Sequence, residues 1–341
     1  MKRTLTSIAL IAVLAAFMLC GYFVSPIFVD MLILLFLAGA TFEMRKCLKD
    51  SGYDMYIAPA VIMLIFTYPV FYLMQHYIGD SAGLQGILIV LLVSIAVCIA
   101  IFTFRPLMKK KQGGEKADSD DVAPAEVAVG SEPISAEQCC KSENATEKKS
   151  INSLFANVFL IAYPMIFMTV AWVVGYKYSA LFAVLYAIVV PIIGSDMFAF
   201  FAGSLIGGKK LCPSISPKKT VAGAVGGLVG GAAVSVVFWA IFEYVGSIAP
   251  EFTAQIGYIP FISHSDVGWM WKSALIYLAI GIICGAVSEV GDLCASGIKR
   301  ALGIKDYGKI FPGHGGFMDR IDSVMYCLVV LLVAFTCIYG S

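Results

Sequence analysis

Residues 84–104 have the sequence LQGILIVLLVSIAVCIAIFTF, in which no side chain carries a charge. A helix needs roughly 20 predominantly apolar residues to cross the hydrocarbon core of a bilayer. Such a stretch is unfavourable in water, whereas a helix satisfies its backbone hydrogen bonds internally when it lies in lipid. This stretch therefore predicts a membrane-spanning helix.

The whole chain shares this apolar character. Of its 341 residues, 60% are hydrophobic and 14% are charged, and the mean hydropathy is +0.87. A typical soluble domain is about 45–50% apolar and about 25% charged. We therefore predict an all-α, polytopic integral membrane protein with about nine transmembrane helices. The expected spans are residues 6–25, 27–42, 56–76, 84–104, 153–175, 179–204, 221–246, 271–291 and 322–340.

Lysine and arginine residues fall mainly in alternate loops between these spans. Cytoplasmic loops of membrane proteins carry an excess of these residues. When the N-terminus is placed in the cytoplasm, only Lys177 and Lys272 fall on the outer side. We therefore expect a multi-pass protein of the cytoplasmic (inner) membrane with an external C-terminus. The net charge of +1 gives no indication of a nucleic-acid partner, and we expect none.

Residues 106–150 differ in composition from the rest of the chain. They are rich in Lys, Glu, Asp, Ser and Ala and contain few large apolar side chains. Such a segment cannot bury enough surface to offset its ordering entropy. We predict a disordered, charged cytoplasmic linker, which separates an N-terminal four-helix membrane region (1–105) from a C-terminal five-helix catalytic region (151–341).

The first polar region of interest begins at Asp196, which lies inside an apolar run. A carboxylate is costly there and indicates a functional site. The run leads into residues 207–220, GGKKLCPSISPKKT, where ammonium and hydroxyl groups near a helix start suit phosphate oxygens. A basic loop that only sets topology or touches anionic lipids is the alternative. The candidate phosphate ligands are Ser216, Lys218, Lys219 and Thr220.

The glycine run at residues 223–231, GAVGGLVGG, follows directly. It could be mistaken for a nucleotide-binding loop. Because it lies in an apolar span with spacing that suits close helix approach, we interpret it as a packing surface.

The most informative segment is residues 288–322, SEVGDLCASGIKRALGIKDYGKIFPGHGGFMDRID. We expect a polar loop that begins at the end of the eighth span. Carboxylates such as Asp292, Asp319 and Asp322 are hard oxygen ligands that suit Mg²⁺. Cationic side chains in the same segment suit phosphate oxygens. They are Lys299, Arg300, Lys305, Lys309 and Arg320.

Glycines in this segment allow a backbone to approach a ligand closely, as at Gly315 and Gly316. His314 lies between glycines, and binding of phosphate, of a base or ribose, or capping of a turn are all left open. Carboxylates, cations and a glycine turn together suit phosphoryl or nucleotidyl transfer, which depends on positioning and charge neutralisation. The residues alone predict a metal- and phosphate-handling site at the inner membrane face, without identifying a substrate.

The segment resembles the signature of the phosphatidate cytidylyltransferase (CDP-diacylglycerol synthase) family along its whole length. The region of Asp196 and the 216–220 string also resemble the second polar loop of that family. The positions of the last segment that fit the family pattern are Ser296, Ile298, Lys299, Arg300, Lys305, Asp306, Gly308, Phe311, Pro312, His314, Gly315, Gly316, Phe317, Asp319, Arg320, Ile321 and Asp322.

The resemblance implies an all-helical membrane enzyme that transfers CMP from CTP to phosphatidic acid and requires Mg²⁺. A second cation, monovalent or divalent, and a homodimer are left open, and membrane lipids are the expected surroundings. It implies metal ligation by Asp292 and Asp319, to which we add Asp196, and catalytic roles for Asp292, Asp319, Lys299 and Arg320. The expected substrate-binding residues are Ser216, Lys218, Lys219, Thr220, Ser296, Arg300, Lys305, Lys309, His314, Gly315, Gly316 and Asp322.

Three positions depart from the family pattern. Ala222 and Ala295 stand where the family commonly has acids, and Glu289 stands where a neutral amide is more usual. We still expect an active enzyme, because Asp292, Asp319 and the cations are present. The alternatives are a CTP-dependent lipid or prenol kinase, a catalytically weakened homologue, and an ion-coupled transporter.

Overall fold

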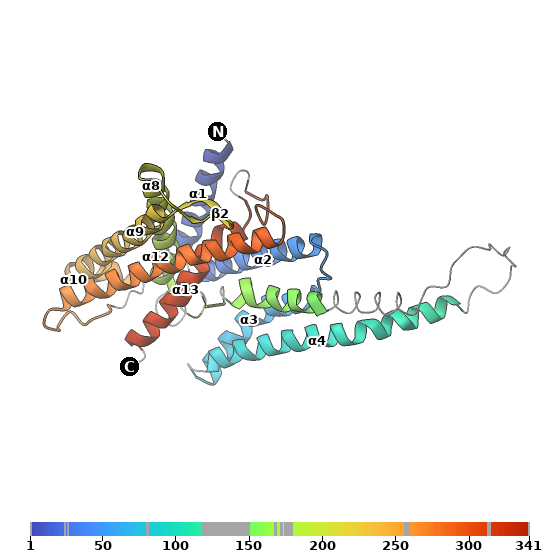
Figure 1. Cartoon of the computed structure of the whole chain (residues 1–341). Coiled ribbons are helices and arrows are strands. Elements are labelled where there is room, and N and C mark those ends of the chain that lie inside the picture. Colours follow the sequence, from blue (N-terminus) through green and yellow to red (C-terminus); the bar gives the residue numbers. More distant parts are fainter. Residues whose placement is uncertain are drawn as a thin grey trace. The chain divides into compact units, whose positions relative to one another are not determined.

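The computed structural model in Figure 1 describes residues 2–23, 25, 27–79, 82–117, 151–166, 169–170, 173, 180–255, 260–311 and 315–339. Its first four helices are α1 (Lys2–Phe23), α2 (Ile27–Asp50), α3 (Ala58–Tyr77) and α4 (Ala82–Ala117). A π-helical segment, η1 (Ile161–Ile166), continues the helix that begins at Ile151. The later helical elements are α7 (Ala180–Val189), η3 (Val190–Met197), α8 (Phe198–Leu205), α9 (Val221–Trp239), η4 (Ala240–Tyr244), α10 (Val245–Ile248), α11 (Pro250–Gln255), α12 (Trp269–Ala301) and α13 (Met318–Tyr339).

The structure confirms an all-α polytopic membrane protein. Within the described residues, seven helices are long and apolar enough to cross a membrane, and two shorter apolar helices lie at Ala12–Gly21 and Ile151–Pro164. Together these helices correspond one by one to the predicted spans. The seven longer candidates are Ile27–Asp50, Ala58–Tyr77, Gln85–Thr103, Leu185–Leu205, Val221–Ile248, Trp269–Ala301 and Met318–Ile338.

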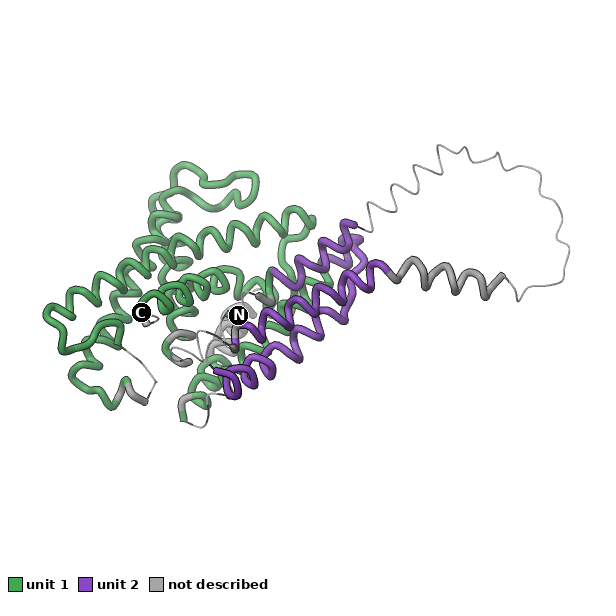
Figure 2. Tube along the Cα trace, turned by 90° about the horizontal axis from the view of Figure 1, so that it is seen from below, with its two compact units in different colours: residues 1–47, 163–341 green, residues 48–162 purple. Residues whose placement is uncertain are grey.

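The chain divides into two compact units, which Figure 2 colours separately. Unit 1 comprises residues 1–47 and 163–341, and unit 2 comprises residues 48–162. Within unit 2, α3 packs against α4, and Asn157 holds the loop before α3 by accepting from Tyr56 N at 2.7 Å and donating to Asp54 O at 2.8 Å. The predicted separation by a linker stays a prediction, since α4 continues to Ala117 and residues 118–150 lie outside the described residues.

The centre of unit 1 is the antiparallel pair of α9 and α12. At one end of the pair Lys219 contacts Glu289, and at the other Trp239 Nε1 donates to Ser273 Oγ at 2.9 Å. Between them the backbones approach closely at Gly231. A Cβ at this position would lie 2.7 Å from Gly281 O. The interpretation of the glycine run as a packing surface is confirmed.

Large aromatic side chains fill the interior of unit 1. Phe182, Tyr186, Tyr277 and Phe335 expose 2% of their surface or less, and their rings contact one another across α7, α12 and α13. Other apolar side chains face outward, such as Leu205 at 83% exposed. An apolar outer surface is the expected surface of a membrane protein in lipid.

Helix α12 is longer than predicted. The sequence suggested a loop from residue 292, but the helix continues to Ala301, so Lys299 and Arg300 lie in its last turn. Cations in a last turn complement the partial negative charge of the helix end. The helix stops at a Schellman motif, in which Gly303 has φ +69° and Ile304 N donates to Lys299 O at 2.9 Å.

A short antiparallel hairpin of β1 (Lys210–Cys212) and β2 (Ser216–Thr220) joins α8 to α9 and was not predicted. Lys210 pairs with Thr220, and Cys212 pairs with Ser216. Along β2, Lys218 is exposed and Lys219 is half-buried. Thr220 then caps α9, because its Oγ1 accepts from Gly223 N at 3.0 Å.

Candidate active site

A cavity of about 330 Å³ lies in unit 1 where α8, β2, α9 and α12 meet. Small-ligand pockets usually enclose about 300–1,000 Å³, so this cavity is large enough to receive part of a substrate. Three acids and two lysines lie among apolar and small side chains in its wall. The lining residues are Asp196, Ala199, Phe200, Gly203, Ser204, Lys218, Lys219, Thr220, Gly223, Ala224, Glu289 and Asp292.

Lys219 lies between two of these acids. Its Nζ is 2.5 Å from Glu289 Oε2 and 2.8 Å from Asp292 Oδ2. Burial lowers the pKa of Lys219, but the two carboxylates outweigh this effect and hold the pKa above its usual value. The ammonium group is therefore charged at neutral pH and neutralises part of the acidic charge in the cavity wall. We refer to Lys219, Glu289 and Asp292 as the Lys219 cluster.

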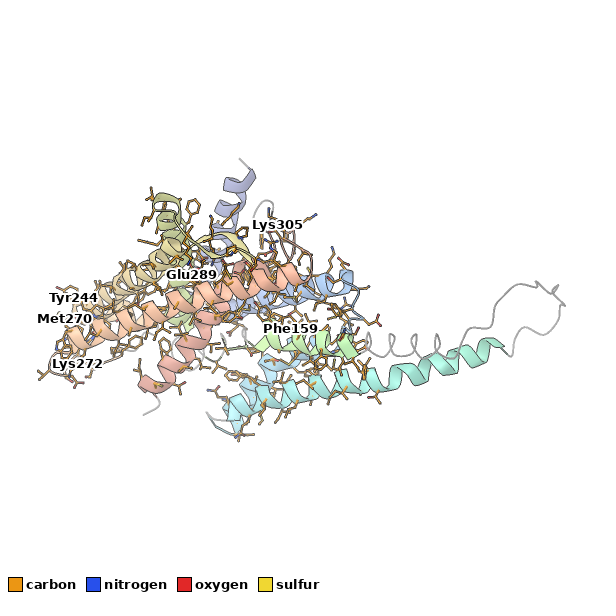
Figure 3. All side chains as sticks on the ribbon, in the orientation of Figure 1. Phe159, Tyr244, Met270, Lys272, Glu289 and Lys305 are labelled. Atoms are coloured by element: carbon orange, nitrogen blue, oxygen red, sulfur yellow. The ribbon has the colours of Figure 1, made fainter. Side chains whose placement is uncertain are left out.

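The carboxylate of Glu289 is the least exposed member of this cluster. Glu289, labelled in Figure 3, is 7% exposed and reaches from α12 toward α9. A Cβ at Gly227 of α9 would lie 2.9 Å from Glu289 Oε1. The missing side chain at Gly227 therefore provides the space in which the Glu289 carboxylate meets Lys219.

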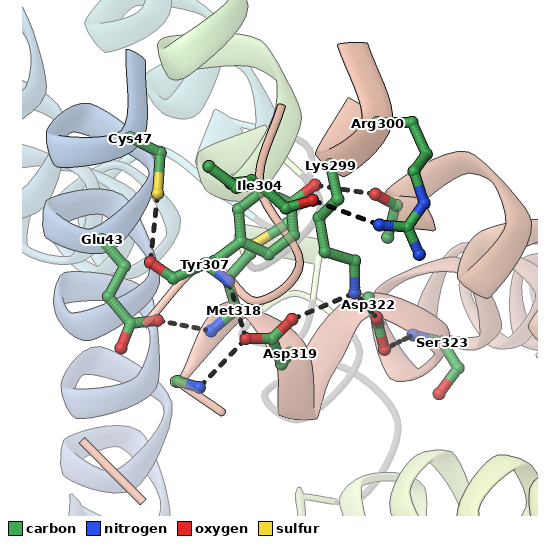
Figure 4. A network of polar contacts seen from close by, with 12 residues as sticks. Glu43, Cys47, Lys299, Arg300, Ile304, Tyr307, Met318, Asp319, Asp322 and Ser323 are labelled. Carbon is green, nitrogen blue, oxygen red and sulfur yellow. Dashed lines mark hydrogen bonds and ion pairs between the residues drawn. The ribbon is translucent and has the colours of Figure 1, made fainter. Parts of the chain in front are cut away.

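A second cluster surrounds Lys299, two helical turns further along α12, and is shown in Figure 4. Lys299 Nζ is 3.0 Å from Asp319 Oδ1 and 3.8 Å from Asp322 Oδ2. Asp322 is itself fixed by Ser323 N, which donates to its Oδ1 at 2.9 Å. We refer to Lys299, Asp319 and Asp322 as the Lys299 cluster.

Asp319 also organises the loop between α12 and α13, residues 302–317. Its Oδ2 accepts from Tyr307 N at 2.9 Å and from Gly316 N at 3.0 Å. Burial, together with repulsion from Asp322 and Asp319, raises the pKa of Tyr307 well above its usual range. The phenol therefore stays protonated and donates to Ala295 O at 3.1 Å.

The Lys219 cluster and the Lys299 cluster interact electrostatically with each other. Asp292 and Lys299 are seven residues apart on α12, which places them on one face of the helix. Asp292 interacts electrostatically with both Asp196 and Asp322. The structure therefore brings Asp196 close to acids of the 288–322 segment along α12.

The other predicted site residues differ in their exposure. Ser216 and Ser296 are half-buried, Lys305 and Lys309 are exposed, and Arg320 is half-buried. Arg300 is exposed and donates to Ile215 O and to Ile304 O, each at 3.4 Å. Gly315 has φ +81°, and its carbonyl oxygen accepts a hydrogen bond from Phe311 N at 2.9 Å in an isolated antiparallel β-bridge. His314 lies outside the described residues, and the assigned role of each residue stays a prediction.

Two residues of α2 were missed by the sequence analysis. Glu43 Oε2 accepts from Met318 N at 3.0 Å, and Cys47 Sγ donates to Tyr307 O at 3.0 Å, as Figure 4 shows. Both contacts hold the α12–α13 loop. Glu43 carried little signal in the sequence, because it directly follows the predicted span 27–42 and lies close to the cations Arg45 and Lys46.

The donor groups in the cavity fit a magnesium ion in kind. Asp196, Glu289 and Asp292 supply carboxylate oxygens, the ligands that Mg²⁺ prefers. The ammonium group of Lys219 partly neutralises the negative charge of Glu289 and Asp292. In the part of the chain that the structure describes, no group of three or more His, Cys, Asp or Glu side chains is arranged to hold a metal ion. Both oxygens of Asp319 are engaged by Lys299 and by backbone N–H groups.

Comparisons with known proteins agree with the acid and lysine pattern. Residues 1–338 match the model of the Cytidylyltransferase family. A phosphatidate cytidylyltransferase of Staphylococcus saprophyticus is 36% identical over 171 residues, which cover 48% of this chain and 55% of the relative. The enzyme of the same name from Bacillus subtilis is 35% identical over 148 residues, covering 43% of this chain and 45% of the relative.

The chain spans about half the length of the curated relatives it matches. The family model, by contrast, extends over nearly the entire sequence, including α2 and all of the clusters described above. The chain therefore belongs to the cytidylyltransferase family.

Proposed function

We propose that this chain transfers CMP from CTP to phosphatidic acid, giving CDP-diacylglycerol and pyrophosphate at the cytoplasmic face of the membrane. The observation that supports this most is the pair of lysine–carboxylate clusters along α12, one of which lines a cavity between membrane helices. Relatives named phosphatidate cytidylyltransferase support the same activity.

The reaction is a displacement at phosphorus. A phosphate oxygen of phosphatidic acid attacks the α-phosphorus of CTP, a new P–O–P linkage forms, and the bond to the β-phosphate breaks. Pyrophosphate leaves with the electron pair of that bond. Phosphate monoesters have a second pKa of about 6, so the attacking oxygen is already ionised near neutral pH and needs no strong general base.

The chain's own residues bind and orient the reactants. Lys218 and Lys219 at the cavity, together with the cations of α12 and α13, supply positive charge for phosphate oxygens. The cations of α12 and α13 are Lys299, Arg300 and Arg320. Thr220 fixes the start of α9 beside the cavity. The acyl chains of phosphatidic acid remain in the lipid, so only the headgroup has to enter.

Magnesium is the proposed cofactor, held by Asp292 and Asp196 at the cavity, with Asp319 nearby in the Lys299 cluster. When bound, Mg²⁺ neutralises the negative charge that builds up on phosphate oxygens. Lys219 contacts Asp292 in the wall of the cavity, so its ammonium group is placed to bind a phosphate oxygen of a substrate that enters there.

The test is a transfer assay with purified protein in detergent, short-chain phosphatidic acid, Mg²⁺ and CTP labelled at the α-phosphate. We expect label in the lipid product, its loss with EDTA, and a loss of about 100-fold or more with Asp292→Asn. Glu251→Gln, an exposed acid on α11, is the matched control and should keep full activity.

The rival functions give different outcomes in the same assay. A CTP-dependent lipid kinase would transfer label only from the γ-phosphate of CTP. A folded wild-type protein without any lipid product, beside an active relative, would indicate a weakened homologue. If Asp292→Asn kept full Mg²⁺-dependent activity, the assignment of Asp292 would be wrong.

A further inference from the structure

Helix α2 lies far in sequence from both clusters but contacts the segment that leads from α12 into α13. Glu43 is 7% exposed, and its Oε2 accepts from the backbone N–H of Met318, the first residue of α13. The first N–H groups of a helix have no partner within the helix and favour a negative charge. Glu43 therefore satisfies the start of the helix that bears Asp319 and Asp322.

The same face of α2 makes a second contact with the α12–α13 loop. Cys47 is one helical turn beyond Glu43, and its Sγ donates to Tyr307 O at 3.0 Å. Tyr307 lies in the first half of the loop, and Met318 follows its last residue. Two side chains on one face of α2 thus contact Tyr307 in the loop and Met318, the residue that directly follows the loop.

The loop fits closely against this face. A Cβ at Gly308 or at Gly316 would collide with the Glu43 carboxylate. The ring of Phe317 packs on α2, with its centroid 5.3 Å from that of Phe36 and an interplanar angle of 89°. Close contact on several sides indicates that the carboxylate occupies a specific place.

The two carboxylate oxygens of Glu43 differ in their hydrogen bonding. Its Oε1 is buried and, among the described residues, has no hydrogen-bond partner. A buried acceptor without a partner is unfavourable. An apolar side chain would avoid this penalty but would leave the Met318 N–H without its acceptor, so the carboxylate is suited to hold the start of α13.

The loop that Glu43 contacts also binds the carboxylate of Asp319. Asp319 Oδ2 accepts from Tyr307 N and Gly316 N, and its Oδ1 pairs with Lys299. Tyr307 and Gly316 are also the parts of the loop that α2 contacts. Any shift of the loop away from α2 would therefore move Asp319 relative to Lys299.

We propose that Glu43 is a positioning residue, which acts through the α12–α13 loop to keep Asp319 and Lys299 in their reactive arrangement. The inference rests on the proposed function, since it concerns the same site. It assigns no contact with substrate to Glu43. Because the hydrogen bond to Met318 N requires only an acceptor, a glutamine at this position should largely replace the glutamate.

The experiment compares Glu43→Ala, Glu43→Gln and Thr41→Ala in the full-length protein. Thr41 is the matched control, because it is a buried polar residue of α2 whose Oγ1 bonds within its own helix, to Leu37 O. Two quantities are measured: CMP transfer to phosphatidic acid, and hydrogen–deuterium exchange of peptides that contain Tyr307 and Gly316. The exchange measurement does not depend on activity.

We expect Glu43→Ala to lower kcat/KM by about 100-fold, the size of effect that a 1 Å misplacement can have, and to speed exchange in the loop. Glu43→Gln should stay within about tenfold of wild type, since the acceptor remains, and Thr41→Ala should resemble wild type in both measurements. If Glu43→Ala proves unstable, Cys47→Ala should give a smaller effect in the same loop peptides.

Three results would overturn the proposal. The first is full activity of Glu43→Ala. The second is an inactive Glu43→Ala whose loop exchanges hydrogen at the rate of wild type. The third is a Glu43→Gln variant as inactive as Glu43→Ala, which would mean that the negative charge acts directly. A wild-type protein that lacks CMP transfer, while Glu43→Ala still loosens the loop, would overturn the proposed function and leave the contact with α2 standing.

Discussion

Lys219 shares one ammonium group between Glu289 and Asp292, whose side chains are 8% and 33% exposed. Two acids so close to each other repel unless a cation lies between them. Removing the lysine leaves the more buried acid without a partner, and an unpaired buried charge destabilises a protein far more than the intact pair stabilises it. The effect of a variant at Lys219 therefore depends on which acids remain.

We expect Lys219→Met to lower the free energy of unfolding by about 1–3 kcal/mol, below the range for fully buried pairs because the lysine is partly solvated. The double variant Lys219→Met/Glu289→Gln should recover part of this loss, since the buried charge has been removed. Thermal unfolding in detergent measures both effects. If the double variant lost as much free energy of unfolding as Lys219→Met and Glu289→Gln lose together, the interaction between the two residues would not be supported.

The raised pKa of Lys219 makes a prediction about pH. A lysine whose pKa is higher in the folded than in the unfolded protein stabilises the fold at pH values below about 10.4, its usual pKa, and loses this effect as the pH rises through the folded value. Between about pH 7 and 9 the difference in melting temperature between wild type and Lys219→Met should stay constant. A difference that falls steadily across this range would indicate a lowered pKa instead.

At the scale of elements, the sequence predicted what depends on local composition. Apolar runs predicted the membrane helices, and the glycine spacing predicted the contact face of α9. The hairpin before α9 was missed because its strands are three and five residues long and include Pro217, which gives no periodic signal. The length of α12 was underestimated because its last turns are polar and contain Gly297, although no proline occurs in the helix.

The close approach of α9 to α12 leads to a prediction about Gly231. We expect Gly231→Val to separate the two helices and to destabilise the protein by about 1–3 kcal/mol, the usual effect of overpacking. Lys219 directly precedes α9 and Asp292 lies on α12, so separating the two helices would move these side chains apart. Transfer activity should therefore fall as well.

The matched control for Gly231→Val is Val229→Leu, which adds apolar volume to the outward face of the same helix, where Val229 is 60% exposed. It should leave the melting temperature in detergent and the transfer rate close to those of wild type. Equal losses in both variants would mean that α9 tolerates no added volume anywhere, and the specific contact at Gly231 would not be supported.

At the scale of the whole molecule, the candidate site depends on contacts that sequence patterns do not contain. Asp292, Lys299 and Asp319 could be identified from residue types and their arrangement in one segment. The contact between Glu43 and Met318 joins positions 275 residues apart, so no periodicity or spacing could predict it. The family model covers both ends of this contact, which agrees with one functional unit built from the two ends of the chain.

The antiparallel pair α9–α12 also makes the orientation in the membrane testable. The lysine-rich hairpin before α9 and the cationic end of α12 lie at the same end of this pair, where Lys219 meets Asp292. The excess of cations predicts that this end is cytoplasmic. Residues just before α12 should then be external.

In a variant whose ten native cysteines are replaced, we expect Ser265→Cys to react with a membrane-impermeant maleimide in intact cells. Ser214→Cys, in the hairpin, should react only after the membrane is opened. Both serines are exposed, so unequal access of the reagent to the two sides, rather than burial, decides the outcome. Labelling after solubilisation provides the control for total thiol. Reaction of both positions from the same side would refute the antiparallel span between them, and reversed labelling would place the candidate active site outside the cell, where CTP is not supplied.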